Sequence, residues 1–199
     1  MSLNGLKIGY GLSGSFCTFE KSFKAAEKLV ELGAELVPVM SYNAAGLSTR
    51  FGTAEENKNR LENIAKRKVI CTIEDAEPIG PNKMCDVMVV APCTANTLAK
   101  LSLGITDTPL TMAVKSHLRN GLPVVIAIST NDALAGSAKN IGMLQNYRNY
   151  YFVPYRQDNF KNKPNSVVAD FSLLPQTIEL ALSGIQIQPL LRQHSTTTA

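Results

Sequence analysis

Short apolar runs alternate with longer amphipathic segments along the chain. The apolar runs predict buried strands at residues 6–11, 35–41, 68–73, 86–92, 122–129 and 150–155. Apolar residues at helical spacing predict helices over residues 18–33, 54–67, 95–103, 110–118, 134–144 and 167–182. Strands that alternate with helices imply a parallel sheet covered on both faces. The predicted fold class is therefore α/β, a doubly wound parallel sheet in three layers of the Rossmann-like or flavodoxin-like kind.

The length and composition predict one globular domain. The chain has 199 residues, of which 45% are apolar and 18% charged, and we expect a single domain at 1–185 with a loosely ordered C-terminal tail at 186–199. No run approaches the roughly 18 apolar residues of a membrane span. The first residues lack the apolar core of a secretion signal. These features favour a soluble, cytoplasmic protein.

Charge and metal-ligating residues exclude two classes of function. The four cysteines are scattered and only two histidines are present, so we expect no metal site. The net charge is only +4. The one basic cluster, at residues 66–68, ends a predicted helix that begins with acidic residues, and no aromatic residues accompany it. Nucleic-acid binding is therefore not expected.

Small polar side chains gather where four predicted strands end. The segments are LSGSF at 12–16, SYN at 41–43, PCTANT at 92–97 and STND at 129–132. Ligands of doubly wound sheets bind beyond the carboxyl ends of the strands. The repeated pattern predicts one binding site to which all four segments contribute.

The glycine-rich segment at 11–15 allows two interpretations, a phosphate site at a helix start or an ordinary tight turn. Gly9, Gly11 and Gly14 have the GxGxxG spacing of dinucleotide sites. However, the second strand ends at Ser41 rather than at an acidic residue that would bind a ribose. If the segment binds a ligand, a monophosphate fits it best.

Hydroxyl and amide groups at 94–97 exceed what a helix cap needs. Thr94 alone would cap the helix, and the additional groups of Asn96 and Thr97 suit a polar heterocycle. Residues 129–132 resemble a cap or Asx turn. Asp107 is expected to cap the helix near Pro109. His117 is expected at the surface rather than in a catalytic role.

These motifs resemble the flavoprotein family of FMN-binding cysteine decarboxylases and flavin prenyltransferases. The family pattern PxSANTxAKxxxGxxD is matched over residues 92–107, with Thr94 in place of serine, and the resemblance covers roughly residues 5–183. It implies a flavoprotein fold and an FMN cofactor. The expected cofactor-binding residues are Ser13, Gly14, Ser15, Phe16, Ser41, Thr94, Ala95, Asn96, Thr97 and Thr130. The phosphate would lie at the first four residues and Ser41, and the ring over 94–97.

The chain departs from the two known reactions of that family. The decarboxylases carry a histidine after the second strand, where this chain has SYN, and their PxMN motif becomes Ser129, Thr130 and Asn131. The prenyltransferases carry an arginine where Thr130 stands, and a tyrosine near Phe160. The resemblance therefore implies a flavin pocket without the groups of either reaction.

Other stretches resemble a narrower branch of the family from spore-forming bacteria. They are RFG at 50, AEPIGP at 76, TDTPLTMAVKSHLRNG at 106, STNDAL at 129, YFVP at 151 and KPNSVVA at 163. This branch implies an oxidoreductase subunit of the mother-cell cytoplasm, with a partner subunit that binds NAD(P) and a small-molecule substrate. It also implies a homo-oligomer, a trimer or larger.

The residues leave three functions open. The first is a subunit that contributes to the oxidation, with Asp132 and Asn131 as candidate catalytic residues because Asp132 follows the most apolar strand. The second is a non-catalytic, stabilising or regulatory partner with a vestigial pocket. The third is a stand-alone flavin-modifying enzyme. Asp107 and Cys93 are the other titratable groups at the strand ends.

Overall fold

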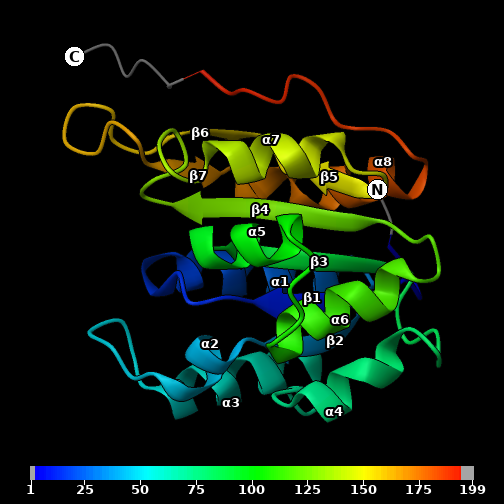
Figure 1. Ribbon diagram of the computed structural model, residues 1–199. Helices are drawn as coiled ribbons and strands as arrows, with labels where there is room; N and C mark the ends of the chain where they lie inside the picture. Colours follow the sequence, from blue (N-terminus) through cyan, green and yellow to red (C-terminus); the bar gives the residue numbers. More distant parts are fainter. Residues whose placement is uncertain (1–2, 194–199) are drawn as a thin grey trace.

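The computed structural model describes residues 3–193 and has a central sheet of mostly parallel strands (Figure 1). The parallel strands lie in the order β2 (Glu35–Met40), β1 (Lys7–Leu12), β3 (Val87–Cys93), β4 (Val124–Thr130) and β5 (Tyr150–Phe152). This order, 2-1-3-4-5, is the flavodoxin-like one. The direction in which successive strands are added to the sheet reverses between β1 and β3, although the strands themselves are parallel. The predicted α/β fold class is confirmed.

Two short strands extend the outer edge of β4. The last residues of β4 pair antiparallel with β7 (Val167–Ala169), and β7 pairs antiparallel with β6 (Tyr155–Gln157). Only the first half of β4 pairs with β5. The carboxyl end of β4 is therefore bordered by the segment that connects β6 to β7, which becomes part of the candidate site.

Helices cover both faces of the sheet. One apolar cluster joins it to α1 (Phe19–Glu31), α2 (Tyr42–Gly46), α3 (Ala54–Ala65) and α8 (Leu174–Leu182). A second cluster joins the other face to α4 (Ile73–Ala76), α5 (Ala95–Ser102), α6 (Pro109–Leu118) and α7 (Ala138–Asn146). Figure 1 shows α5, α6 and α7 in front of the sheet and α1 and α8 behind it. Short 3-10 turns lie at Phe16–Thr18, Glu77–Ile79 and Phe171–Leu173.

The glycines at the GxGxxG spacing serve the packing of β1. A methyl group on Gly9 would collide with the sulfur of Met88, and one on Gly11 would collide with Leu110 of α6. The absence of side chains at these positions lets β3 and α6 approach β1 closely. Gly9 and Gly11, two of the three glycines of that spacing, therefore have a structural role that needs no dinucleotide.

Three predicted elements differ from the structure. The strand predicted at 68–73 is reduced to one isolated bridge between Ile70 and Val39, because Thr72 caps α4 directly after it. The apolar run at 150–155 is divided into β5 and β6, with Pro154 between them. The helix predicted from residue 167 starts only at Leu174, because the β-branched Val167 and Val168 pair with β4.

One further helix has different bounds, and two short helices were not predicted. The helix predicted at 134–144 spans Ala138–Asn146. A turn precedes it, in which the N–H groups of Ala135 and Ser137 donate to the carbonyl of Asp132. The short helices α2 and α4 were not predicted, because four or five residues are too few for a periodic pattern.

Residues 186–193 run along the domain. The side-chain amide of Gln186 bonds the backbone N–H and C=O of Phe152, at 2.7 and 2.8 Å. Ile187 is buried, and Leu191 bridges Tyr155. The rest of the predicted tail, 194–199, lies outside the described residues, and the domain division at 185 stays a prediction.

Candidate functional site

Two neighbouring cavities lie at the carboxyl ends of β1, β3 and β4. The threonine cavity has a volume of about 470 Å³ and is lined by Gly14, Ser41, Tyr42, Asn43, Thr94, Ala95, Asn96, Thr97, Lys100, Asp107, Thr108 and Thr130. The basic cavity has a volume of about 600 Å³ and is lined by Gly14, Ser15, Phe16, Cys17, Thr18, Lys21, Thr49, Arg50, Phe51, Thr94, Ser129, Thr130, Asn131, Asp158, Lys163, Ser166, Val167 and Val168. Gly14, Thr94 and Thr130 line both.

Another cavity, of about 660 Å³, lies between α6 and the segments that follow α5 and α7. It contains none of the predicted site residues. The strand-end cavities bring together all of the predicted cofactor-binding residues except Ser13.

Ser13 holds β1 to β3 at the base of the site. Its side chain is 1% exposed, and its hydroxyl donates to the carbonyl of Pro92 at 2.8 Å and accepts from the N–H of Thr94 at 2.9 Å. Ser13 lines neither cavity. Its hydroxyl therefore positions the two strand ends that carry Gly14 and Thr94.

The turn after Ser13 presents backbone donors. Within the described chain, no acceptor receives the N–H of Gly14 or Phe16, and both residues line the cavities. Ser41, across the threonine cavity, caps α2 by accepting from the N–H of Ala44 at 3.3 Å. Unpaired N–H groups near hydroxyl groups are what a phosphate needs.

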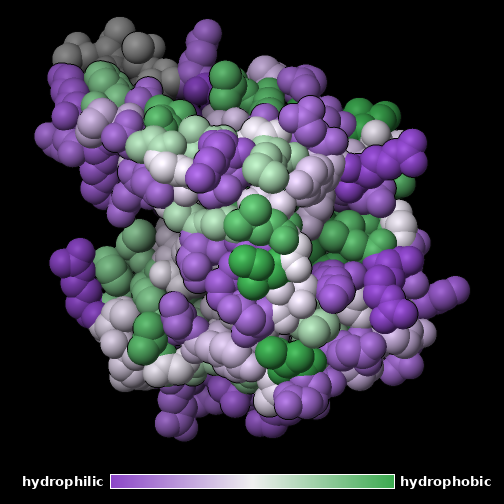
Figure 2. Space-filling view, in the orientation of Figure 1, coloured by the Kyte–Doolittle hydropathy of each residue, from purple (hydrophilic) through white to green (hydrophobic). Residues whose placement is uncertain are grey.

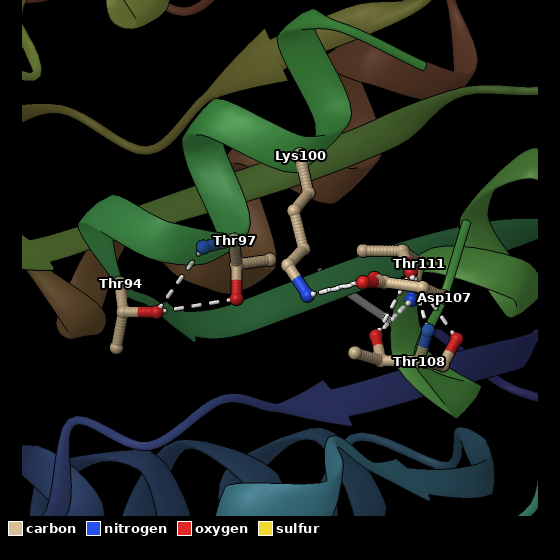
Figure 3. Close-up of polar contacts among 6 residues, drawn as sticks. All are labelled: Thr94, Thr97, Lys100, Asp107, Thr108 and Thr111. Atoms are coloured by element: carbon tan, nitrogen blue, oxygen red, sulfur yellow. Dashed lines mark hydrogen bonds and ion pairs between the residues drawn. The ribbon is translucent and has the colours of Figure 1, made fainter. Parts of the chain in front are cut away.

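The start of α5 forms one wall of the threonine cavity (Figure 3). Thr94 caps the helix through the N–H of Thr97, and the two hydroxyls lie 3.1 Å apart. Asn96 is exposed, and its side-chain amide has no hydrogen bond to the described residues. The capping role and the predicted ligand role of this segment are therefore compatible.

An ion pair between Lys100 and Asp107 lines the same cavity. Lys100 Nζ lies 2.7 and 2.9 Å from the two carboxylate oxygens of Asp107 (Figure 3). This hydrogen bond holds the pKa of Asp107 below its ordinary value. The prediction that Asp107 caps α6 is wrong, because Thr108 caps that helix through a reciprocal bond with Thr111. Asp107 is instead the partner of the one lysine in this cavity.

Both predicted catalytic residues form hydrogen bonds within the chain. Asp132 accepts from the hydroxyls of Thr130 at 2.7 Å and Ser137 at 2.9 Å, and it lines neither cavity. Asn131 lines the basic cavity and accepts from Ser166 at 3.3 Å. In this arrangement, Asp132 orients the hydroxyl of Thr130 toward itself and holds the turn before α7.

The remaining titratable candidates lie in the core. His117 is buried rather than at the surface as predicted, because α6 packs against both the sheet and α4. Its Nε2 lies 3.0 Å from the carbonyl of Pro123, and burial lowers the pKa of its ring. Cys93 is also buried, and burial raises the pKa of its thiol. Neither residue lines a strand-end cavity.

Sequence reasoning did not select the basic residues of the second cavity. Lys21, Arg50 and Lys163 lie on three separate segments and meet only in the folded chain. The available signal was weak, since Arg50 and Lys163 lie in stretches noted only for their resemblance to the narrower branch. Lys100 was noted only as part of the family motif.

Two further features bear on other functions. No helix in the part of the chain described here is long and apolar enough to cross a membrane. Over the same residues, no cluster of three or more metal-ligating side chains occurs.

Comparisons with known proteins agree with the geometry. The family described as Flavoprotein matches residues 1–169. The B subunit of dipicolinate synthase from Bacillus subtilis (strain 168) is 46% identical over 193 residues, which cover 97% of this chain and 96% of that protein. The crystal structure of the corresponding B subunit from Bacillus halodurans C superposes with a TM-score of 0.89 and 43% identity, over 97% of this chain and 99% of that one. The FMN-dependent cysteine decarboxylase SpaF superposes with a TM-score of 0.67 and 25% identity, over 90% of this chain and 99% of that one.

Proposed function

Because this chain belongs to the flavoprotein family and is a near full-length homologue of the B subunit of dipicolinate synthase, we propose that it serves in that role. It acts with an NAD(P)-dependent A subunit in the cytoplasm of a sporulating mother cell. The complex converts a hydroxy-tetrahydrodipicolinate into dipicolinate. That conversion requires loss of one water, transfer of two electrons and a proton, as hydride, to the nicotinamide, and release of a second proton to solvent.

The observation that carries the proposal is the convergence of polar groups from three strand ends on the threonine cavity. FMN is the cofactor that these groups fit. Its phosphate would lie against the unpaired N–H group of Gly14, which lines both cavities, with Ser41 on the side of the threonine cavity and the unpaired N–H group of Phe16 on the side of the basic cavity. Its polar ring would lie along 94–97, where Asn96 has an unpaired amide. Bound FMN would supply redox chemistry to the site, with the nicotinamide of the A subunit as the final electron acceptor.

A pair of variants at Gly14 tests the phosphate position. A methyl group here would lie 3.4 Å from Cβ of Asn43 and 3.5 Å from the ring of Phe16, which are ordinary contacts. Gly14→Asp and Gly14→Asn add side chains of equal size and differ in charge. We expect Gly14→Asp to bind FMN more than about tenfold more weakly than Gly14→Asn, because like charges about 4 Å apart repel by several kcal/mol near a protein surface.

FMN binding is measured by quenching of flavin fluorescence with the purified chain. Equal affinities of the two variants would contradict the phosphate position. Absence of FMN binding by the parent chain would contradict the cofactor assignment itself.

The chain's own ionisable groups point to a dependence on the partner. In the threonine cavity they are Tyr42 and the ion pair of Lys100 with Asp107, and a side chain cannot accept the two electrons. We expect the isolated chain to form no dipicolinate, and activity to appear with the A subunit and NAD(P). Production of dipicolinate by this chain alone, measured by its ultraviolet absorbance, would contradict this division.

A second function, a non-catalytic stabilising partner, is favoured by one observation. Asp132, the candidate acid–base residue, makes two hydrogen bonds and lines neither cavity. For this function, the A subunit alone would reach the full rate once stabilised by other means. We also propose that the chain forms a homo-oligomer, a trimer or larger, which light scattering of the purified protein would measure.

A further inference from the structure

We infer that the basic cavity binds the two carboxylates of a small cyclic dicarboxylate, beside the group that the threonine cavity holds. The inference rests on the proposed function and names the place of its substrate. Three positively charged residues line this cavity, Lys21 of α1, Arg50 and Lys163. Asp158 is the one acidic residue among the lining residues, all of which are described.

The charge of the cavity remains positive after its internal pairing. Lys163 Nζ lies 3.6 Å from a carboxylate oxygen of Asp158, which makes a loose ion pair. Lys21 and Arg50 have no carboxylate partner among the described residues. Like charges gathered around one cavity create a positive potential that attracts anions. Two positive groups in excess match the charge of a dicarboxylate.

Arg50 is held on a rigid turn at the edge of this cavity. The backbones of Thr49 and Gly52 exchange hydrogen bonds of 3.0 and 3.2 Å, and the hydroxyl of Thr49 accepts from the N–H of Phe51. Gly52 has a φ of 131°, which favours glycine. The Arg50 guanidinium lies 4.9 Å from the centre of the Phe51 ring. A guanidinium presented from this turn is suited to bidentate binding of a carboxylate.

Three hydroxyl groups line the cavity between the charged segments. The hydroxyls of Thr18 and Ser129 lie 2.6 Å apart, and that of Ser15 lies 3.0 Å from Ser129 and 3.2 Å from Thr18. Each hydroxyl has one hydrogen and can rotate it. The cluster can therefore turn a donor toward a second carboxylate, on the side of the cavity formed by β4 and the start of α1.

The position and shape of the cavity favour a dicarboxylate over a single anion. Figure 2 shows a recess at the left edge of the molecule with hydrophilic side chains on either side of it. In Figure 1 the turn before α3 and the segment between β6 and β7 project at that edge. The cations of this 600 Å³ cavity come from both of these segments and from α1. Because these cations come from three segments, a ligand with two carboxylates can contact more than one of them.

The substrate would then lie next to the proposed cofactor. Gly14, Thr94 and Thr130 form the shared wall of the two cavities. A ring held by its carboxylates in the basic cavity would therefore border the segment at 94–97. No bond is made or broken in this inference, which concerns binding and orientation only.

Calorimetric titration of the full chain tests the inference, with FMN present and then absent. The probes are dipicolinate, picolinate, which has one carboxylate, and inorganic phosphate. We expect dipicolinate to bind most tightly and to bind more weakly as salt is raised. Arg50→Gln and Lys163→Gln should each weaken dipicolinate about five- to tenfold. Lys139→Gln is the matched control, because Lys139 is an exposed lysine of α7 outside both cavities.

The outcomes separate this inference from the proposed function. The inference is overturned if the parent does not bind dipicolinate, if phosphate or picolinate binds as tightly, or if both cavity variants bind like the Lys139 control. Each variant is also titrated with FMN. In the parent chain, normal FMN binding without selective binding of dipicolinate would overturn the inference alone, and selective binding of dipicolinate without FMN binding would overturn the cofactor assignment alone.

Discussion

Ser13→Ala distinguishes a positioning residue from a ligand contact. The substitution removes the hydroxyl that accepts from the N–H of Thr94 at 2.9 Å and donates to the carbonyl of Pro92 at 2.8 Å. Pro92 keeps a partner, because its carbonyl also accepts from the N–H of Ser13 at 3.2 Å. The N–H of Thr94, which points at the buried Ser13, loses its acceptor. An unsatisfied donor of this kind costs about 1–3 kcal/mol of folding free energy.

The assay is urea unfolding without FMN, followed by circular dichroism. The expected loss lowers the midpoint at an unchanged slope. Ser15→Ala is the control, because Thr18 and Ser129 still bond each other at 2.6 Å without it, so its loss should stay below about 1 kcal/mol. If Ser13→Ala is no less stable than Ser15→Ala and loses only FMN affinity, then Ser13 contacts the ligand directly and the structural reasoning fails.

Three further predictions concern the cofactor site and the core. Thr97→Val should weaken FMN binding by about 0.5–1.5 kcal/mol in a fluorescence titration. Asn96→Leu should weaken it more, because the ligand would lose the side-chain amide that is unpaired in the chain alone. Parent-like binding by both variants would contradict the ring position. The pKa of His117 is lowered in the folded chain. The stability that its neutral ring contributes is therefore fully present above the unfolded-state pKa of about 6.5, and it is lost as pH falls toward the lowered pKa of the folded state. Urea unfolding between about pH 7.5 and about pH 5.5 should therefore show a steeper loss for the parent than for His117→Gln, and equal slopes would argue against a buried neutral ring. Cys17 is exposed and Cys93 is buried with a raised thiol pKa, so Ellman's reagent should modify Cys17 in the folded chain and Cys93 only on unfolding; rapid reaction of Cys93 would contradict its burial.

The elements that sequence patterns identified are those with continuous burial. All residues of β3 are buried, and so are all but the last of β4, so each appears as an unbroken apolar run. The strand-end polar clusters were also visible, because small polar residues contrast sharply with such runs. Their convergence followed from the parallel order of the strands.

The errors arose where tertiary partners decide the outcome. His117 lies on a helix that is covered on two sides, by the sheet and by α4, whereas helical periodicity assumes one buried face. The prediction that Asp107 caps α6 was wrong, because Lys100 Nζ lies 2.7 Å from its carboxylate and Thr108 caps that helix instead. Arg50 and Lys163 lie 113 positions apart in segments without periodic patterns, so neither could be assigned to a shared cavity.

The hydrogen bonds beneath the two cavities suggest how one chain could orient two ligands at once. Ser13 joins the ends of β1 and β3, and the hydroxyl of Ser15 joins the turn after β1 to Ser129 of β4. These contacts fix the positions of Gly14, Thr94 and Thr130 relative to one another, and these three residues separate the cavities. In the proposed function, the distance between cofactor and substrate is thus set by buried bonds within this chain. In that function, this chain would supply orientation and charge neutralisation, and the nicotinamide of the partner would be the final electron acceptor.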